Sequence, residues 1–218
     1  MRFQPTHYNW TQSTMALTDE HNETKWNNYY KTVAGRAPRE LFWQSVVRFK
    51  PGDSQVSYAI DLGCGVGIET RELLKRGWRV LAIDSQPEAM AWLESHTPSE
   101  QQSNLETQIV SFEQVVLPVS DFIWASVSLP FCPPQSFNEL WNKIVTSLRT
   151  GGRFAGDFFG MRHCWADQKN MTFHTAEQVK ELCQPLYIEY FISEEGERST
   201  ALDGIQPWQA YSVIARKP

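Results

Sequence analysis

The residues best suited to chemistry form a short run in which an acid precedes three alternating glycines, Asp61-Leu62-Gly63-Cys64-Gly65-Val66-Gly67. The apolar run Val56–Asp61 predicts a strand that ends on this acid, and Glu69–Arg76 predicts a helix soon afterwards. Glycines at such a turn allow a ligand to approach the backbone, and the N–H groups at a helix start attract a carboxylate or phosphate. The run therefore predicts a ligand-binding turn between a strand and a helix.

A second acid, Asp84, ends the next predicted strand, Trp78–Asp84, and lies 19 residues after Gly65. A carboxylate at this distance can accept hydrogen bonds from both hydroxyls of a ribose, so the pair predicts an adenosine-containing ligand. A dinucleotide fingerprint would need a glycine at position 68, which is Ile68. The charge of Asp61 would also repel a pyrophosphate, whereas it suits a sulfonium or ammonium group. The pattern favours S-adenosylmethionine over NAD, and an NAD-dependent oxidoreductase stays as an alternative.

The elements that must position these residues alternate between strand and helix. This alternation predicts an α/β fold with a Rossmann-like, seven-stranded, mostly parallel sheet, helices on both faces and an antiparallel C-terminal strand pair. Residues 1–50 are expected to form an N-terminal arm and helical lid, and the charged segment Glu194–Gln209 a loop. The further predicted strands are Thr107–Phe112, Asp121–Ser126, Arg153–Phe159, Tyr187–Ser193 and Ala210–Ala215, and the further helices are Pro87–His96, Phe137–Leu148 and Thr175–Gln184.

The glycine run resembles motif I of class I S-adenosylmethionine-dependent methyltransferases, and Asp84 matches their ribose-binding acid. Asp121–Ser126 resembles the fourth-strand motif of this family, and Arg149–Phe154 resembles its turn before the fifth strand, with Thr150 in place of the usual proline. Trp26–Tyr30 is similar to small-molecule members of the tellurite-resistance and thiopurine kind. The resemblance implies a methyltransferase domain at residues 51–218 that acts on a small molecule by in-line methyl transfer. A non-catalytic protein that binds the cofactor is the other alternative.

The resemblance also implies which residues hold S-adenosylmethionine. Its methionine end is expected against Asp61 and the glycines, and its ribose on Asp84. Ser111 and Glu113 both remain candidates for the adenine amine. The expected cofactor-binding residues are Asp61, Gly63, Cys64, Gly65, Gly67, Asp84, Ser85, Ser111, Phe112, Glu113 and Ser126.

The acceptor side is predicted from aromatic residues that follow the fourth and fifth strands, in the segments Leu129–Pro134 and Phe158–Trp165. Tyr30 and His163 are the candidate catalytic residues, and His163 is either a general base or a histidine of a surface loop. Arg162 either binds an acidic acceptor or is solvated. The candidate substrate-binding residues are Trp26, Tyr30, Phe131, Arg162 and Trp165.

Composition narrows the partners of this 218-residue chain. It has 20 Lys and Arg against 25 Asp and Glu, a net charge of −5, which gives no general attraction to nucleic-acid phosphates. No apolar stretch reaches the ~18 residues of a membrane helix, and the first residues lack the apolar core of a signal peptide. The cysteines and histidines show no metal-ligand spacing. We expect a cytoplasmic monomer or homodimer that binds a small-molecule acceptor and no metal, nucleic acid or membrane.

Overall fold

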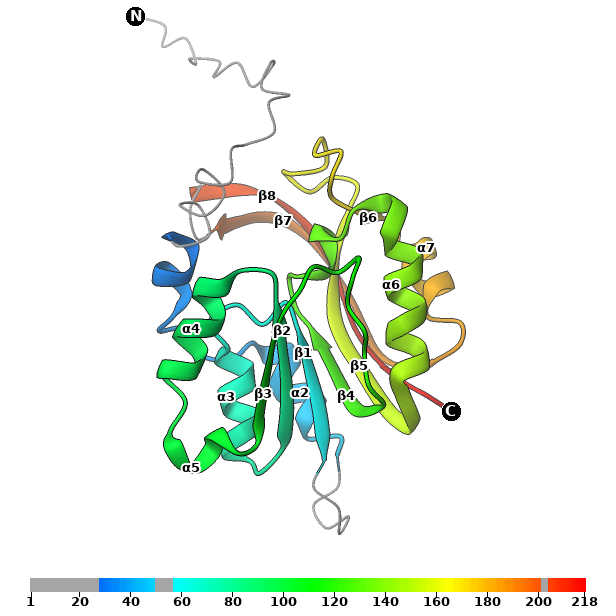
Figure 1. The fold of residues 1–218 in the computed structure, drawn as a ribbon. Coiled ribbons are helices and arrows are strands. Elements are labelled where there is room, and N and C mark those ends of the chain that lie inside the picture. The colour runs from blue at the N-terminus through cyan, green and yellow to red at the C-terminus, as the bar shows by residue number, and fades with distance from the viewer. Residues whose placement is uncertain (1–27, 50–56, 201–203) are drawn as a thin grey trace, which may run out of the picture.

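The frame of the molecule is one mixed sheet, seen in the computed structural model, which describes residues 28–49, 57–200 and 204–218 (Figure 1). The strand order is β3-β2-β1-β4-β5-β8-β7, and β6 pairs with β5 outside this path. Neighbours from β3 to β5 are parallel, whereas β8 is antiparallel to β5 and to β7. This arrangement confirms the expected sheet. The strands are β1 (Tyr58–Leu62), β2 (Arg79–Asp84), β3 (Leu105–Ile109), β4 (Ser120–Ala125), β5 (Leu148–Gly160), β6 (Phe173–His174), β7 (Tyr187–Thr200) and β8 (Gly204–Arg216).

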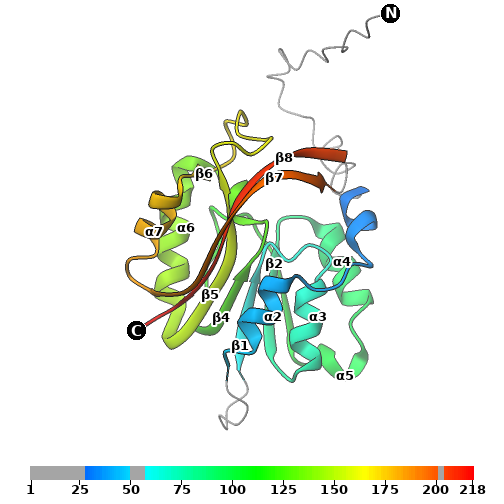
Figure 2. The ribbon, with the colours of Figure 1, turned by 180° about the vertical axis from the view of Figure 1, so that it is seen from behind.

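Helices cover both faces of the sheet, as the front and back views show (Figures 1 and 2). Parallel strands of this kind carry apolar side chains on both faces, which must both be buried. The helices are α2 (Glu40–Val46), α3 (Ile68–Lys75), α4 (Pro87–Ser95), α5 (Ser99–Gln102), α6 (Pro134–Ser147) and α7 (Ala176–Leu182), with the 3-10 turn η1 (Leu129–Phe131) after β4.

The two faces are sorted by the alternation of side chains along each strand. Ile60 and Phe154 point to the face covered by α6 and α7. Their neighbours in sequence, Ala59 and Ala155, point to the opposite face, in a cluster with side chains of α2 and α3. Glycine-loop residues such as Val66 pack with Leu93 of α4 in a third cluster. Both faces of the sheet are therefore buried under helices, and the glycine loop is packed against α4.

The strand order reverses at β1, which lies between β2 and β4. The carboxyl ends of these strands therefore meet at the switch point, where ligands of such sheets bind. The glycine run follows β1, Asp84 ends β2, and the turn η1 follows β4, so the topology brings the sequence motifs to one edge.

The segment at residues 194–209 differs from the expected loop. Strands β7 and β8 pair without interruption from Tyr187 opposite Arg216 to Thr200 opposite Gly204, apart from one register shift. The far part of this hairpin is exposed, so its sequence carries no alternation of buried and polar residues, and the interpretation as a loop was wrong. Backbone pairing and the Arg198–Glu194 ion pair, at 3.2 Å, hold it instead.

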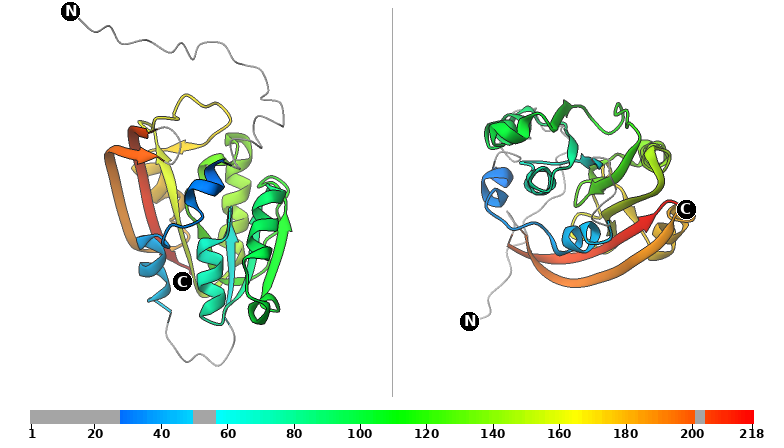
Figure 3. Two further views of the ribbon diagram at one scale, coloured as in Figure 1. Left: turned by 90° about the vertical axis from the view of Figure 1, so that its left-hand side faces the viewer. Right: turned by 90° about the horizontal axis from the view of Figure 1, so that it is seen from below.

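The N-terminal part described by the structure begins with a helical segment at residues 28–33. This segment lies beside α4, where Tyr30 and Val33 pack in one cluster with Leu93 (Figures 1 and 3). Helix α2, also within the expected lid, packs on the sheet through Leu41 and Phe42. Trp26 and most of the expected arm lie outside the described residues.

We predict that Gly67→Ala destabilises the fold by about 2–4 kcal/mol, because a left-handed backbone and overpacking both cost free energy. Gly67 has a φ of +68°, and a Cβ there would lie 2.4 Å from Cδ1 of the buried Leu93. Gly77→Ala is the matched control, since its φ is +80° but nothing lies within 4 Å of its Cβ position. Urea unfolding should show a clearly smaller loss for Gly77→Ala, and equal losses would contradict this packing of the loop.

Candidate functional site

The glycine loop is built by backbone conformations that favour glycine. Gly63, Gly65 and Gly67 have φ values of +77°, +52° and +68°. The N–H groups of Gly63 and Cys64 donate to the carbonyl of Ile83, at 2.8 and 3.0 Å, so the loop is tied to β2. A Cβ on Gly63 would lie 2.4 Å from that of Ser128, which follows β4. The glycine loop therefore contacts β2 on one side and the segment after β4 on the other.

Asp84 joins the end of β2 to the glycine loop. Its Oδ2 accepts the N–H of Gly65 at 2.8 Å, and its Oδ1 accepts the N–H of Gln86 at 3.0 Å. Burial raises the pKa of Asp84, and these backbone hydrogen bonds act in the opposite direction. The two features that the sequence spaces 19 residues apart are therefore in direct contact.

Tyr30 lies against the same pair of residues. Its Cε1 is 3.4 Å from the Cβ position of Gly65, and its side chain hydrogen-bonds to Asp84. The residue is only 7% exposed, and burial together with the charge of Asp84 raises the pKa of its hydroxyl. Tyr30 therefore stays protonated at neutral pH and donates a hydrogen bond to Asp84.

Asp61 is a buried carboxylate, 2% exposed, at the end of β1. Thr70 of α3 donates its hydroxyl to Oδ2 of Asp61 at 2.6 Å. Burial raises the pKa of Asp61 to about 7. Within the described part of the chain, neither Asp61 nor Asp84 forms an ion pair. A cationic ligand group would supply the missing partner.

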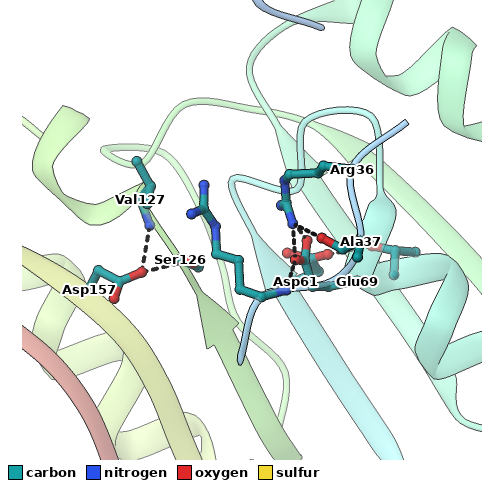
Figure 4. Close-up of polar contacts among 9 residues, drawn as sticks. Arg36, Ala37, Asp61, Glu69, Ser126, Val127 and Asp157 are labelled. Atoms are coloured by element: carbon teal, nitrogen blue, oxygen red, sulfur yellow. Dashed lines mark hydrogen bonds and ion pairs between the residues drawn. The ribbon is translucent and has the colours of Figure 1, made fainter. Parts of the chain in front are cut away.

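An ion pair beside Asp61 joins the N-terminal segment to α3 (Figure 4). Arg36 donates to both carboxylate oxygens of Glu69, at 2.6 and 2.9 Å, and the N–H of Arg39 reaches Glu69 at 3.2 Å. The Nε atoms of both arginines are buried without a partner in the described residues. The sequence analysis missed these residues, because only the approach of the N-terminal segment to α3 brings them together.

The loop after β4 is held by Asp157 of β5 (Figure 4). Oδ2 of Asp157 accepts the Ser126 hydroxyl at 2.6 Å and the Val127 N–H at 3.2 Å. Ser128 donates its hydroxyl to the carbonyl of Leu62 at 2.6 Å. Ser126 was expected from the sequence, whereas Asp157 and Ser128 were missed.

The residues expected near the adenine are less closely joined to the loop. Phe112 is half-buried, and its Cζ lies 3.4 Å from the Cβ position of Gly63. Ser111 is half-buried, and Ser85 and Glu113 are exposed. Cys64 is buried within the loop, where burial raises the pKa of its thiol well above the usual range. These assignments stay predictions.

Two of the expected acceptor residues, Phe131 and Trp165, lie in an aromatic cluster beside Val127, whereas Tyr30 packs with the glycine loop. Phe131 and Trp165 lie with ring centroids 5.9 Å apart, and Phe159 and Trp208 complete the cluster. Arg162 points elsewhere, because its guanidinium donates to both oxygens of Glu195 at 2.7 and 2.5 Å on the exposed hairpin. The structure therefore brings together Phe131 and Trp165 and directs the Arg162 side chain to an ion pair.

His163 lies inside this cluster, not on a surface loop. It is 3% exposed and stacks on Phe159 with ring centroids 3.9 Å apart. Its Nδ1 accepts the N–H of Trp165 at 3.2 Å, so the proton of the neutral ring belongs on Nε2. Burial lowers the pKa of His163 to about 4. The surface alternative is wrong, and the residue is a neutral imidazole at pH 7.

Two features are missing from the part of the chain that the structure describes. No group of three or more His, Cys, Asp or Glu side chains there could hold a metal ion. No helix among the same residues is long and apolar enough to cross a membrane.

The sheet order, the glycine loop and the acid that ends β2 are the features expected of a class I S-adenosylmethionine-dependent methyltransferase. Residues 59–152 match the family described as Methyltransferase domain, and S-adenosylmethionine is the cofactor that such a domain implies. No curated protein matches the sequence.

Solved structures agree on the fold. TehB from Haemophilus influenzae has a TM-score of 0.69 and 15% identity, over 91% of this chain and 66% of that one. The N-methyltransferase NodS from Bradyrhizobium japonicum WM9, bound to S-adenosylhomocysteine, has a TM-score of 0.59 and 15% identity, over 92% and 87%. A phosphoethanolamine N-methyltransferase 2 of Haemonchus contortus, bound to phosphomonomethylethanolamine and S-adenosylhomocysteine, has a TM-score of 0.68 and 15% identity, over 91% and 58%. The chain thus spans less than two thirds of TehB and of the Haemonchus enzyme.

We predict that Asp61→Asn changes how stability depends on pH. The raised pKa means that the folded protein holds this proton more tightly than the unfolded chain, so wild-type stability falls as pH rises from about 4 to about 7. The variant lacks this loss, and its stability relative to the wild type should rise through that window. Urea unfolding at pH 5 and pH 8 measures the difference. The same difference between the two proteins at both pH values would contradict a buried, titrating Asp61.

Proposed function

We propose that this protein transfers a methyl group from S-adenosylmethionine to a small, partly apolar acceptor. The contact between Asp84 and Gly65 at the sheet's switch point supports the proposal, because a carboxylate directly beside the loop can accept the hydroxyls of a ribose. Small-molecule acceptors are supported by the negative net charge of the chain and by its aromatic cluster. The compared Haemonchus enzyme, whose bound phosphomonomethylethanolamine is a small molecule, is consistent with this class.

The residues at the loop fit the charges of the cofactor. Asp61 is a buried carboxylate without an ion pair in the described residues, and it suits the ammonium and sulfonium groups. Arg39 carries a buried, unpartnered Nε and reaches Glu69 through its backbone, so its guanidinium is the candidate for the methionine carboxylate. Asp84 would take the ribose hydroxyls, and Phe112 and either Ser111 or Glu113 the adenine side.

The chain's own contribution is alignment and exclusion of water. S-adenosylmethionine supplies an activated methyl group when it is bound. Tyr30 covers Gly65 from the N-terminal segment, and the Arg36–Glu69 pair holds that segment in place. We infer that residues 28–36 act as a lid over the cofactor, which would keep water from the reacting atoms.

We propose that the acceptor binds against Phe131 and Trp165, which lie next to the loop that follows β4. Neither candidate base is poised to remove its proton at neutral pH. The Tyr30 hydroxyl stays protonated and is hydrogen-bonded to Asp84, and Nδ1 of His163 already accepts a backbone N–H. We therefore favour an acceptor that arrives with a free lone pair, such as a thiolate, an amine or a reduced metalloid.

Two other functions make different predictions. An NAD-dependent oxidoreductase would bind NADH tightly and S-adenosylmethionine poorly. A non-catalytic cofactor-binding protein would bind S-adenosylmethionine without methylating any member of a panel of thiols, phenols, amines and oxyanions.

Asp84→Ala should weaken S-adenosylhomocysteine binding by about 1.5–3 kcal/mol, the range for hydrogen bonds to a charged group. This loss corresponds to about tenfold to somewhat over a hundredfold in Kd, and calorimetry measures it directly. Tyr30→Phe is the contrasting variant, because it keeps the ring over Gly65 but frees an acceptor position on Asp84. Its affinity should be equal to or higher than that of the wild type. Unchanged affinity in Asp84→Ala would remove this residue from the ribose site.

Phe131→Ala should raise the KM of the acceptor by about 10- to 100-fold, since it removes roughly 1.5–3 kcal/mol of apolar contact. The Kd of S-adenosylhomocysteine should stay within about threefold of the wild-type value, a change under 1 kcal/mol. Met161→Ala is the control, because Met161 is exposed directly after β5 and is not part of the aromatic cluster. Steady-state kinetics of methyl transfer tests both variants. Full activity of Phe131→Ala on every accepted substrate would rule out this acceptor site.

A further inference from the structure

Asp157 connects three elements at the carboxyl edge of the sheet. Its Oδ2 accepts the Ser126 hydroxyl and the Val127 N–H from the loop after β4, at 2.6 and 3.2 Å. Its Oδ1 accepts the hydroxyl of Ser212 on β8, at 2.6 Å. The residue is 7% exposed and forms no ion pair within the described residues. Neutral donors alone hold this buried carboxylate, and two of its three hydrogen bonds reach one short loop.

That loop has a strained backbone. Val127 has a φ of +53°, and among the described residues no other non-glycine residue has a positive φ. The left-handed region is unfavourable for a β-branched side chain, so surrounding contacts must hold it there. Strain of this kind persists where the structure over-determines it, and it is concentrated at functional sites.

The strained residue lies between the two halves of the proposed active site. On its C-terminal side, Ser128 donates to the carbonyl of Leu62 and lies against Gly63 of the glycine loop. The Val127 side chain itself packs on the aromatic cluster that includes Phe131. The backbone of this loop therefore determines how the glycine loop and the aromatic cluster face each other.

We propose that Asp157 is a positioning residue for methyl transfer, which holds Ser126 and Val127 in the strained conformation that aligns the acceptor with the cofactor. The inference rests on the proposed function, because alignment matters only if a methyl group is transferred. It adds a role for a residue that touches neither cofactor nor acceptor. Without the carboxylate, the loop relaxes and productive alignment becomes a minor conformation.

A set of paired variants separates positioning from simple stabilisation. Asp157→Ala removes both acceptor oxygens, whereas an Asn would keep both loop contacts by turning its amide nitrogen toward the Ser212 hydroxyl. Val127→Gly makes the left-handed conformation free of strain, whereas Val127→Ala shortens the side chain and keeps the strain. Asp157→Ala should lower kcat about tenfold or more, both alone and when it is added to Val127→Ala. When the same substitution at position 157 is added to Val127→Gly, kcat should fall by less than about threefold. The difference between the falls in the two backgrounds corresponds to the free-energy cost of the strain at Val127. Cofactor Kd should change little in each.

Two further variants complete the set. Ser212→Ala removes the hydrogen bond from β8 and leaves both loop contacts, so kcat should stay within about threefold, under 1 kcal/mol in barrier height. Ser126→Ala removes one loop contact and keeps the carboxylate. If Asp157→Ala does not fold, Ser126→Ala should give a smaller fall in kcat with the same dependence on the residue at position 127. An equal fall in kcat whether position 127 is Val, Ala or Gly would overturn the proposal. So would a loss of stability with no change in kcat per folded enzyme.

A crystal structure of Asp157→Ala gives a readout that needs no acceptor. The φ of Val127 should become negative in this variant, and a φ that stays positive would overturn the proposal. Calorimetry with S-adenosylhomocysteine on the wild type separately tests the proposed function. Failure of cofactor binding would refute methyl transfer but would leave the conformational result at Val127 readable.

Discussion

Buried carboxylates without cations are the constraint on which this edge of the sheet depends. Asp61, Asp84 and Asp157 lie on β1, β2 and β5, and in the described residues each is held by hydrogen-bond donors alone. Burying a charge is costly unless its oxygens are satisfied, so the donors must stay in place. Those donors belong to the glycine loop, to α3 and to the loop after β4. Hydrogen bonds to these carboxylates therefore fix the conformations of the surrounding loops. The negative charge of the three acids suits a cationic ligand.

The N-terminal segment completes this arrangement from outside the sheet. Tyr30 reaches Asp84, and Arg36 reaches Glu69 in the first turn of α3. Both contacts join a segment before β1 to residues that hold the glycine loop. The post-β4 loop closes the opposite side through Ser128 and Asp157. Cofactor affinity and acceptor alignment are thus expected to respond to different residues.

Much of the fold and of the cofactor side could be predicted because their signals are local. The positions of the glycine run and of Asp84 at strand ends could be predicted from the residue types. In the structure a hydrogen bond joins the two. The Ser126–Asp157 contact could not be predicted, since its partners are 31 residues apart and meet only through strand register. The burial of His163 depends on Trp208, which belongs to a hairpin whose exposed residues gave no pattern. Interactions set by tertiary packing were missed for this reason.

The central claim is that S-adenosylmethionine lies along the glycine loop with its ribose on Asp84 and its methionine end at Asp61. A crystal structure of the chain with S-adenosylhomocysteine tests it most directly. The account predicts that the ribose hydroxyls lie within hydrogen-bonding distance of the Asp84 carboxylate. The sulfur should face the loop after β4, with open space toward Phe131. A ligand bound elsewhere, or with its adenine at Asp61, would contradict the account.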